Sequence, residues 1–270
     1  MAAVEEVCPA SWAELVDALF AEPWPDHAGR FHSNLIHRGM ADASWRLEPS
    51  LHHLGLVEQE AHVLRNFKKY GRQVGSAPLS EWEWVTLGQH HGLPTRLLDW
   101  TYSPLVALHF ATASARHRDT DGVVWTFDFV RAHRRLPGVL RQLLESEGAG
   151  AFTTELLERV APTLDALDAL SDDPFLLVLE PPSLDARVVN QYSGFALVSP
   201  TATTLGEWLE EQDEPLARKV RVGAELKAEV RERLDQANVN ERVLFPGLDG
   251  LTSWLIRYYT SGERRLPGAG

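Results

Sequence analysis

The sequence predicts an α+β fold, and three observations lead to this expectation. Helical patterns come first along the chain, with apolar residues spaced three and four positions apart. Strand-like runs and further helical patterns then follow irregularly, without the regular strand–helix–strand order of a doubly wound sheet. The chain also lacks a Walker loop and a Gly-x-Gly-x-x-Gly motif, so the usual nucleotide cradles of doubly wound folds are absent.

The first part of the chain is expected to be largely helical. Residues 11–20 have the apolar spacing of an amphipathic helix, with Ser11 placed to cap its N-terminus and Glu14 three residues later, as in a capping box. Residues 35–39 form a short apolar run that ends in Arg-Gly, which predicts a strand leading into a loop. Residues 58–70 carry apolar side chains at helical spacing and predict another helix.

The most informative segment runs from residue 89 to residue 111. A helix over residues 80–91 is expected to lead into it, and Gly92 is placed to end that helix. A short apolar segment then ends on residues 99–101, and a new helix is expected to start at Ser103-Pro104, because Pro is favoured in a first helical turn. Polar groups at such a strand-to-helix junction lie beside free helix N–H groups, so the segment predicts a binding site.

The second half of the chain is predicted to interleave strands and helices. Residues 122–130 are rich in β-branched and aromatic side chains and predict a strand. Residues 131–175, rich in Leu, Glu and Ala, predict a helical insertion within a single domain over residues 1–265. Residues 266–270 are expected to form a disordered tail. The other predicted elements are a strand over 175–180, a strand, a turn and a second strand over 187–198, a strand over 216–222, and a helix over 225–236. Residues 244–251 are expected to turn into a last helix that runs through about residue 259.

Composition and charge narrow the classes of function. The chain has 270 residues, 44% of them hydrophobic, and a formal net charge of −12. Such an acidic chain is poorly suited to non-specific nucleic-acid binding, which needs basic groups against phosphates. The single Cys8 excludes an intramolecular disulfide and a cysteine-based zinc cluster. Neither a signal peptide nor an apolar run long enough to span a membrane is recognised, so a cytoplasmic protein is expected.

Arg38 and Gly39 are the first candidate site, at the end of a predicted strand. A guanidinium can hold a phosphate or a carboxylate through two hydrogen bonds, and a neighbouring glycine lets a ligand approach the backbone. The alternative is an arginine that pairs with one of the chain's 38 acidic side chains.

Gln89, His90 and His91 are the second candidate group. Imidazoles can act as acid, base or metal ligand, but the histidine spacing fits no trusted metal signature, and no metal is expected. The alternative is that these side chains hydrogen-bond the loop and support the end of the preceding helix.

Asp99 and Thr101 are expected to share one face of their strand, because side chains alternate along a strand, and Trp100 is expected to point the other way. Asp99 can orient an imidazole or accept a hydrogen bond from a ribose hydroxyl. The alternative is that Asp99 or Thr101 caps the helix that follows.

Asn190, Gln191, Tyr192 and Gly194 form the last candidate group. Two amides, a phenol and a glycine near a strand turn can recognise a polar planar ligand. The alternative is an ordinary turn, because Asn, Ser and Gly favour turns.

Several of these segments, in this order, resemble the FRG domain, a family named for a Phe-Arg-Gly tripeptide. The tripeptide is here His37-Arg38-Gly39, with a histidine in place of the aromatic residue. The block Gln-His-His-Gly-Leu-Pro-Thr-Arg-Leu-Leu-Asp-Trp-Thr at residues 89–101 is the most specific part, and the resemblance covers roughly residues 11–260. The other matching segments are Trp45–Leu51, the helix around Glu60 and Phe67, Ala107–Ala111, Arg187 with Asn190-Gln191 and Gly194-Phe195, and Leu244–Leu251.

A more distant resemblance is to the ADP-ribosyltransferase fold, which binds NAD in a cleft between two small, mostly antiparallel sheets. This resemblance implies two such sheets here, with an N-terminal helical part and the helical insertion added. It implies that Arg38 binds phosphate at the end of the first core strand, while Thr101 and Gln191 bind ribose hydroxyls. These groups would surround a bond whose cleavage develops an oxocarbenium ion.

The resemblance further implies an enzyme that cleaves the nicotinamide–ribose bond of NAD and transfers ADP-ribose. Gln191 cannot act as a general base, so Asp99, His91 or a group of the acceptor must take the proton. This pattern favours a nucleobase or nucleic acid over a protein side chain as acceptor, and the broader enzyme class suggests a toxin or phage-defence role. The residues expected to act in catalysis are Arg38, Asp99, Thr101, Gln191 and His91. Those expected to bind NAD are Arg38, Gly39, Thr95, Arg96, Trp100, Tyr102, Ser103, Asn190 and Tyr192.

Two alternatives remain open. One is a metal-assisted hydrolase of phosphoester or nucleotide substrates that uses His90, His91 and Asp99. The other is a non-catalytic module that binds a ligand or partner through the same cleft. None of the three hypotheses involves a membrane.

Overall fold

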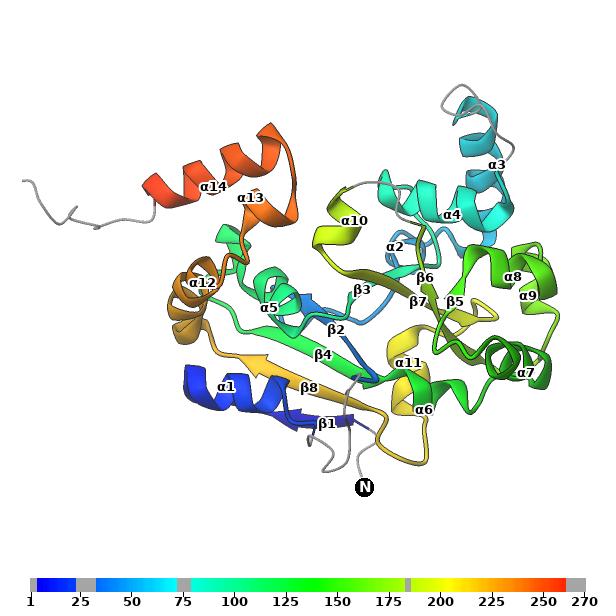
Figure 1. Ribbon diagram of the computed structural model, residues 1–270, viewed down its shortest axis with the longest axis horizontal. Coiled ribbons are helices and arrows are strands. Elements are labelled where there is room, and N and C mark those ends of the chain that lie inside the picture. The colour runs from blue at the N-terminus through cyan, green and yellow to red at the C-terminus, as the bar shows by residue number, and fades with distance from the viewer. Residues whose placement is uncertain (1–3, 23–32, 72–78, 183–185, 261–270) are drawn as a thin grey trace, which may run out of the picture.

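Eight strands form one mixed sheet in the order β1-β8-β4-β2-β3-β7-β6-β5 (Figure 1). The computed structural model describes residues 4–22, 33–71, 79–182 and 186–260. Neighbouring strands are antiparallel, except that β1 lies parallel to β8 and β5 parallel to β6. The strands are β1 (Val4–Val7), β2 (Leu35–Met40), β3 (Leu98–Thr101), β4 (Gly122–Asp128), β5 (Phe152–Thr153), β6 (Phe175–Glu180), β7 (Ser193–Ser199) and β8 (Ala217–Val222). The α+β class predicted from the sequence is confirmed.

The sheet consists of two four-stranded halves that meet between β2 and β3. β2 pairs with β4 along its whole length, and β3 pairs with β7 along its whole length. In contrast, β2 and β3 pair only at His37 and Thr101. The expectation of two separate sheets is wrong, because this residue pair joins the halves into one sheet.

Helices flank both halves of the sheet (Figure 1). The α-helices are α1 (Trp12–Leu19), α2 (Ser50–His53), α3 (Glu60–Gly71), α4 (Glu81–His90), α5 (Pro104–Thr112), α6 (Phe129–His133), α7 (Gly138–Glu147), α8 (Thr154–Val160), α9 (Leu164–Asp168), α10 (Ala186–Asn190), α11 (Leu205–Glu210), α12 (Lys227–Gln236), α13 (Glu241–Leu244) and α14 (Leu248–Thr260). Three 3-10 turns are η1 (Val57–Gln59), η2 (Ala115–His117) and η3 (Ala224–Leu226).

Helices α1, α5 and α12 cover one face of the half that contains β2. Their apolar side chains pack against Val124, Val220 and Val222 of β4 and β8. Strand β2 passes under α5 so closely that a Cβ on Gly39 would lie 1.7 Å from the carbonyl oxygen of Ala107. Glycine at this position is therefore required by helix packing, because any side chain would collide with backbone.

Local signals in the sequence placed the ends of several helices correctly. Ser11 caps α1 by accepting a hydrogen bond from the N–H of Glu14 at 3.3 Å. Ser103 caps α5 in the same way, accepting from the N–H of Val106 at 3.4 Å. Gly92 follows α4 with a φ of +80°, the left-handed conformation that glycine adopts at low cost.

The strand predicted from residue 187 is wrong, because this segment is the short helix α10. Its two valines, Val188 and Val189, favour a strand locally, yet Val189 is 61% exposed and has no sheet partner in the described part of the chain. Tertiary hydrogen bonds hold the end of the helix instead: the Asn190 amide donates to Val243 O at 2.7 Å. β7 then begins at Ser193, after Tyr192 at a φ of +48°.

Two strands were not predicted, and both depend on partners far away in the sequence. β1 is a four-residue edge strand that pairs with β8, and β5 has two residues that pair with β6. Segments this short carry too little alternation to be recognised alone. The predicted tail at 266–270 lies outside the described residues. None of the helices in the described part of the chain combines the length and apolar character that crossing a membrane would require.

Candidate functional site

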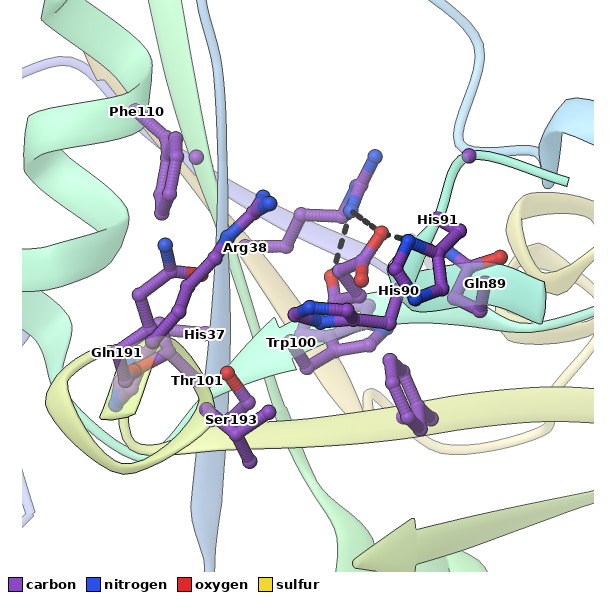
Figure 2. A pocket seen from close by; sticks show the side chains of 16 residues that line it. His37, Arg38, Gln89, His90, His91, Trp100, Thr101, Phe110, Gln191 and Ser193 are labelled. Carbon is purple, nitrogen blue, oxygen red and sulfur yellow. Dashed lines mark hydrogen bonds and ion pairs between the residues drawn. The ribbon is translucent and has the colours of Figure 1, made fainter. Parts of the chain in front are cut away.

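A cavity of about 630 Å³ opens where β2 and β3 part, beside their shared residue pair. Figure 2 shows Arg38 at its centre, with Gln89 and His91 on one side and Phe110 and Gln191 on the other. Its walls come from β2, β3, α5, the end of α4 with the loop after it, α10 and the start of β7. The lining residues are His37, Arg38, Gly39, Gln89, His90, His91, Gly92, Asp99, Trp100, Thr101, Phe110, Arg187, Val188, Gln191, Ser193 and Phe195.

Arg38 connects β2 and β3 where their backbone pairing stops. Its Nη1 donates to the backbone carbonyl oxygen of Asp99 at 2.6 Å and lies 4.0 Å from the Asp99 carboxylate (Figure 2). Its Nε is buried and has no hydrogen-bond partner among the described residues. Burial lowers the pKa of the Arg38 guanidinium, and the nearby Asp99 charge acts against this effect. An arginine keeps its charge under such a shift, so Arg38 places a positive charge in the cavity.

Asp99 is held by a chain of hydrogen bonds from its neighbours. The Gln89 side-chain nitrogen donates to Asp99 Oδ2 at 2.8 Å. The Thr95 hydroxyl donates to the Gln89 side-chain oxygen at 2.6 Å and accepts from the N–H of Leu97 at 3.1 Å. The Asp99 side chain is 63% exposed, whereas Trp100 beside it is buried, which is the alternation expected of a strand.

Thr101 and Gln191 meet across the lower wall of the cavity. The Thr101 hydroxyl donates to the backbone oxygen of Gln191 at 2.6 Å and accepts from the N–H of Ser103 at 3.0 Å. The Gln191 amide nitrogen donates to Leu244 O at 3.0 Å. Both side chains are buried. The hydroxyl proton of Thr101 is thus used within the protein, and α13 sets the orientation of the Gln191 amide.

The three cavity histidines differ in their surroundings. His37 is buried and shares a 2.8 Å hydrogen bond with the Thr126 hydroxyl. Burial and the neighbouring Arg218 lower the pKa of His37 to about 3, so this imidazole is neutral at physiological pH. The rings of His90 and His91 pack edge to face with centroids 5.2 Å apart.

The structure adds Arg187 and Phe110 to the site. Arg187 lies on α10, one helical turn before Gln191, and its guanidinium lies 5.1 Å from the ring of Phe245. The spacing of four residues was visible in the sequence. Arg187 was given no role because a strand was expected there, and on a strand two positions four residues apart lie about 13 Å from each other, whereas on a helix they are neighbours.

Several residues predicted to bind NAD do not line the cavity, namely Thr95, Arg96, Tyr102, Ser103, Asn190 and Tyr192. Arg96 is buried between two carboxylates, with hydrogen bonds of 2.9 Å to Glu60 and 2.7 Å to Asp168. The Tyr102 hydroxyl donates to Glu180 at 2.9 Å. Arg96 and Tyr102 therefore hydrogen-bond carboxylates outside the cavity lining.

Trp100 lies at the cavity wall but is only 3% exposed, because its ring packs in the core against Phe127, with centroids 4.7 Å apart. It therefore presents little surface for a ligand to stack on. The aromatic side chains that line the cavity besides Trp100 and the histidines are Phe110 and Phe195.

The charge of the cavity is opposite to that of the whole chain. Among the described residues, its lining contains two arginines, Arg38 and Arg187, and one carboxylate, that of Asp99. The chain carries 38 acidic and 26 basic side chains. A local excess of guanidinium groups in an acidic protein favours an anionic ligand with more than one oxygen to bind. The part of the chain that the structure describes contains no group of three or more His, Cys, Asp or Glu side chains arranged to hold a metal ion.

Comparison with known proteins identifies part of this chain. Residues 33–120 match the family model of the FRG domain, which confirms the resemblance seen in the sequence. This stretch contributes Arg38, Gln89 and Asp99 to the cavity, while Arg187 and Gln191 come from a later segment. No match was found among curated proteins or among solved structures.

Proposed function

We propose that this chain, whose residues 33–120 form an FRG domain, binds NAD in the cavity between β2 and β3 and transfers its ADP-ribose to an acceptor. The observation that carries the proposal is the pair of arginines in the cavity of an acidic protein. A diphosphate offers several anionic oxygens, and guanidinium groups bind such oxygens through paired hydrogen bonds. The cavity volume of about 630 Å³ also lies in the range of small-molecule sites.

The order of the cavity residues supports the same proposal. Arg38 lies on β2, Thr101 at the β3–α5 junction and Gln191 just before β7. This order resembles that of the ADP-ribosyltransferase fold, in which NAD lies between two small sheets. The two halves of the present sheet, joined through one residue pair beside the cavity, have a similar plan.

Each group then has a defined part in the chemistry. Arg38 and Arg187 bind the diphosphate, and the Gln191 side-chain oxygen accepts from a ribose hydroxyl. Phe110 packs on the nicotinamide ring, a part for which Trp100 and Phe195 are too deeply buried. When the nicotinamide–ribose bond breaks, its electron pair moves to the ring nitrogen and nicotinamide leaves, while positive charge develops on the ribose.

The class of acceptor is inferred from Gln191, which has an amide in place of a carboxylate. An amide cannot remove a proton, so Gln191 gives no base to a weakly nucleophilic protein side chain. A nucleobase nitrogen in a nucleotide or nucleic acid is a better nucleophile, and we propose this class of acceptor. The negative net charge of the chain does not prevent such an acceptor from binding, because the acceptor needs to contact only the cavity.

The test combines binding with turnover. Calorimetry at millimolar NAD is expected to show binding, and chromatography is expected to show nicotinamide release. Arg38→Lys and Arg187→Ala should each weaken NAD binding about tenfold, since a charge-assisted hydrogen bond contributes roughly 1.5 kcal/mol or more. Arg118→Ala is the control, because the Arg118 side chain is 79% exposed and pairs with its neighbour Asp119.

Four outcomes separate the hypotheses. Binding with nicotinamide release that depends on Arg38 supports the transferase. Binding without release points to a non-catalytic module. Absence of NAD binding by the wild-type protein contradicts the proposal, and a stoichiometric metal in the purified protein would direct attention to the hydrolase alternative.

A further inference from the structure

The hydrogen-bond chain Thr95–Gln89–Asp99 has a fixed direction. The Thr95 hydroxyl accepts from the N–H of Leu97, so its proton is available to the Gln89 side-chain oxygen at 2.6 Å. With the oxygen turned to Thr95, the amide nitrogen faces Asp99 Oδ2 at 2.8 Å. The reverse orientation would place the amide oxygen against a carboxylate oxygen, where neither can donate. The Asp99 carboxylate, which can only accept, therefore sets the orientation of the Gln89 amide, and the buried Thr95 hydroxyl holds the amide oxygen in that orientation.

Asp99 is suited to receive a proton from a molecule in the cavity. Among the described lining residues it carries the one carboxylate, and its side chain is 63% exposed. Gln89 contacts Oδ2 from one side, and Arg38 Nη1 lies 4.0 Å from the same oxygen. Both contacts are to Oδ2, so they fix the orientation of the carboxylate. Because the side chain is largely exposed, Oδ1 can accept a hydrogen bond from a ligand.

The histidines are less suited to this task. His37 is held neutral by burial and is bonded to Thr126. The rings of His90 and His91 pack edge to face against each other, with centroids 5.2 Å apart.

We propose that Thr95 and Gln89 are positioning residues, which hold the Asp99 carboxylate as the proton acceptor for the group that attacks the ribose. The inference rests on the proposed ADP-ribosyl transfer. An O–H or N–H of the acceptor forms the new bond to C1′ as the bond from C1′ to nicotinamide breaks. The electron pair of the broken bond leaves with nicotinamide, and the acceptor's proton passes to Asp99 and then to solvent. With water as acceptor, the products are ADP-ribose, nicotinamide and one proton.

The variants separate positioning from folding and from NAD binding. Thr95→Val removes the hydroxyl at nearly constant volume, and Thr95→Ser keeps it. Gln89→Leu removes the amide from a half-buried position, and Gln59→Leu makes the same change at an exposed glutamine away from the cavity. Asp99→Ala removes the carboxylate, and added formate can then act as an external base in the space that is left.

Turnover with water or a nucleobase acceptor and the dissociation constant of NAD are measured for each variant. Asp99→Ala should lower kcat about a hundredfold, as expected for loss of a general base, and formate should restore much of it. Thr95→Val and Gln89→Leu should lower kcat about tenfold or more through misplacement of the carboxylate. In both variants the dissociation constant of NAD should stay within about twofold of the wild-type value, because the groups proposed to bind NAD are unchanged. Thr95→Ser and Gln59→Leu should retain wild-type kcat.

Each other result has a separate meaning. If the wild-type protein turns over NAD but Gln89→Leu keeps full kcat, the positioning role is wrong while the transferase stands. The same holds if formate does not rescue Asp99→Ala, or if Thr95→Val loses kcat and NAD binding together. If the wild-type protein neither binds nor cleaves NAD, the proposed function fails and this inference fails with it.

Discussion

The Nη1 of Arg38 donates to the backbone carbonyl of Asp99 at 2.6 Å, across two neighbouring strands that share a single residue pair. The Arg38 guanidinium thus provides a hydrogen-bond donor to the Asp99 carbonyl, which has no backbone partner on β2. The same side chain is one of the two arginines among the described residues that line the cavity. Arg38 therefore belongs both to the sheet and to the proposed ligand site, and experiments on Arg38 must measure stability and binding.

Arg38→Ala is expected to lower the free energy of unfolding by about 1–3 kcal/mol, because it leaves a carbonyl without its donor. Asp99→Asn keeps that carbonyl and an oxygen that can still accept from Gln89, and it removes the charge of an exposed ion pair at 4.0 Å, so it should cost less than about 1 kcal/mol. Urea unfolding of the two variants checks this difference. Equal losses would mean that the carbonyl contact contributes little.

Gly39→Ala is expected to destabilise the protein by more than about 3 kcal/mol or to prevent folding. The new Cβ would lie 1.7 Å from the backbone oxygen of Ala107, and backbone cannot move aside as a flexible side chain can. Gly138→Ala is the matched control, because its Cβ would meet nothing within 4 Å at the start of α7. It should leave stability unchanged or raise it by about 0.5–1 kcal/mol. Thermal and urea unfolding measure both, and a well-folded Gly39→Ala protein would contradict the packing described for β2 and α5.

Arg96→Met is expected to cost about 3–5 kcal/mol, although Arg96 does not line the cavity. The change leaves the Glu60 carboxylate, whose side chain is 11% exposed, without its charged partner. Adding Glu60→Met should restore part of the loss, because no uncompensated buried charge then remains at that position. A double-mutant cycle by urea unfolding gives the coupling energy. Simple additivity of the two changes would show that the pair is not coupled.

His133 is expected to make stability depend on pH. Its Nδ1 lies 3.0 Å from Gly150 O, and its Nε2 accepts from the N–H of Val178 at 3.0 Å. Burial lowers its pKa to about 4, below the value of 6.5 for an ordinary histidine. The unfolded chain therefore takes up a proton first as the pH falls. The contribution of His133 to the free energy of unfolding is therefore complete above about pH 6.5 and is lost progressively as the pH falls towards 4.

The difference in unfolding free energy between wild type and His133→Gln should accordingly shrink by about 1–2 kcal/mol from pH 7 to pH 5, since one pH unit corresponds to at most about 1.4 kcal/mol per group. Urea unfolding at the two pH values measures it. His53→Gln is the control, because the His53 side chain is 76% exposed. A constant difference for His133→Gln would show that this imidazole is not held neutral by the fold.

Much of the local structure could be predicted from residues close together in the chain. Ser11 caps its helix, α5 begins at Pro104, and Gly92 follows its helix with positive φ, as expected. The cap of α5 is Ser103, and not Asp99 or Thr101 as considered from the sequence. The alternation of exposed Asp99 with buried Trp100 also followed from the strand pattern. Such features depend on hydrogen bonds and side-chain directions within a few residues, which are visible in a sequence.

The convergence of the candidate site could be predicted only in part. Arg38, Asp99, Thr101 and Gln191 do line one cavity. Arg187 was given no role, because the segment that contains it was taken for a strand, and Gln89 was not expected to contact Asp99. Arg96 belonged to the same polar block, but its carboxylate partners lie 36 and 72 residues away in sequence. No pattern of neighbouring residues can reveal such partners.

The sequence by itself thus determined the α+β class, the resemblance to the FRG domain, which the family model matches over residues 33–120, and the ends of several helices. Only the tertiary structure decided that β2 and β3 share the single pair His37 and Thr101, which makes one sheet and leaves a cavity beside it. It also decided that Gly39 serves the packing of α5 and that Arg187 faces the cavity. The reason is that strand partners and buried ion pairs are chosen by packing between distant segments, whose free energy is not carried by either segment alone.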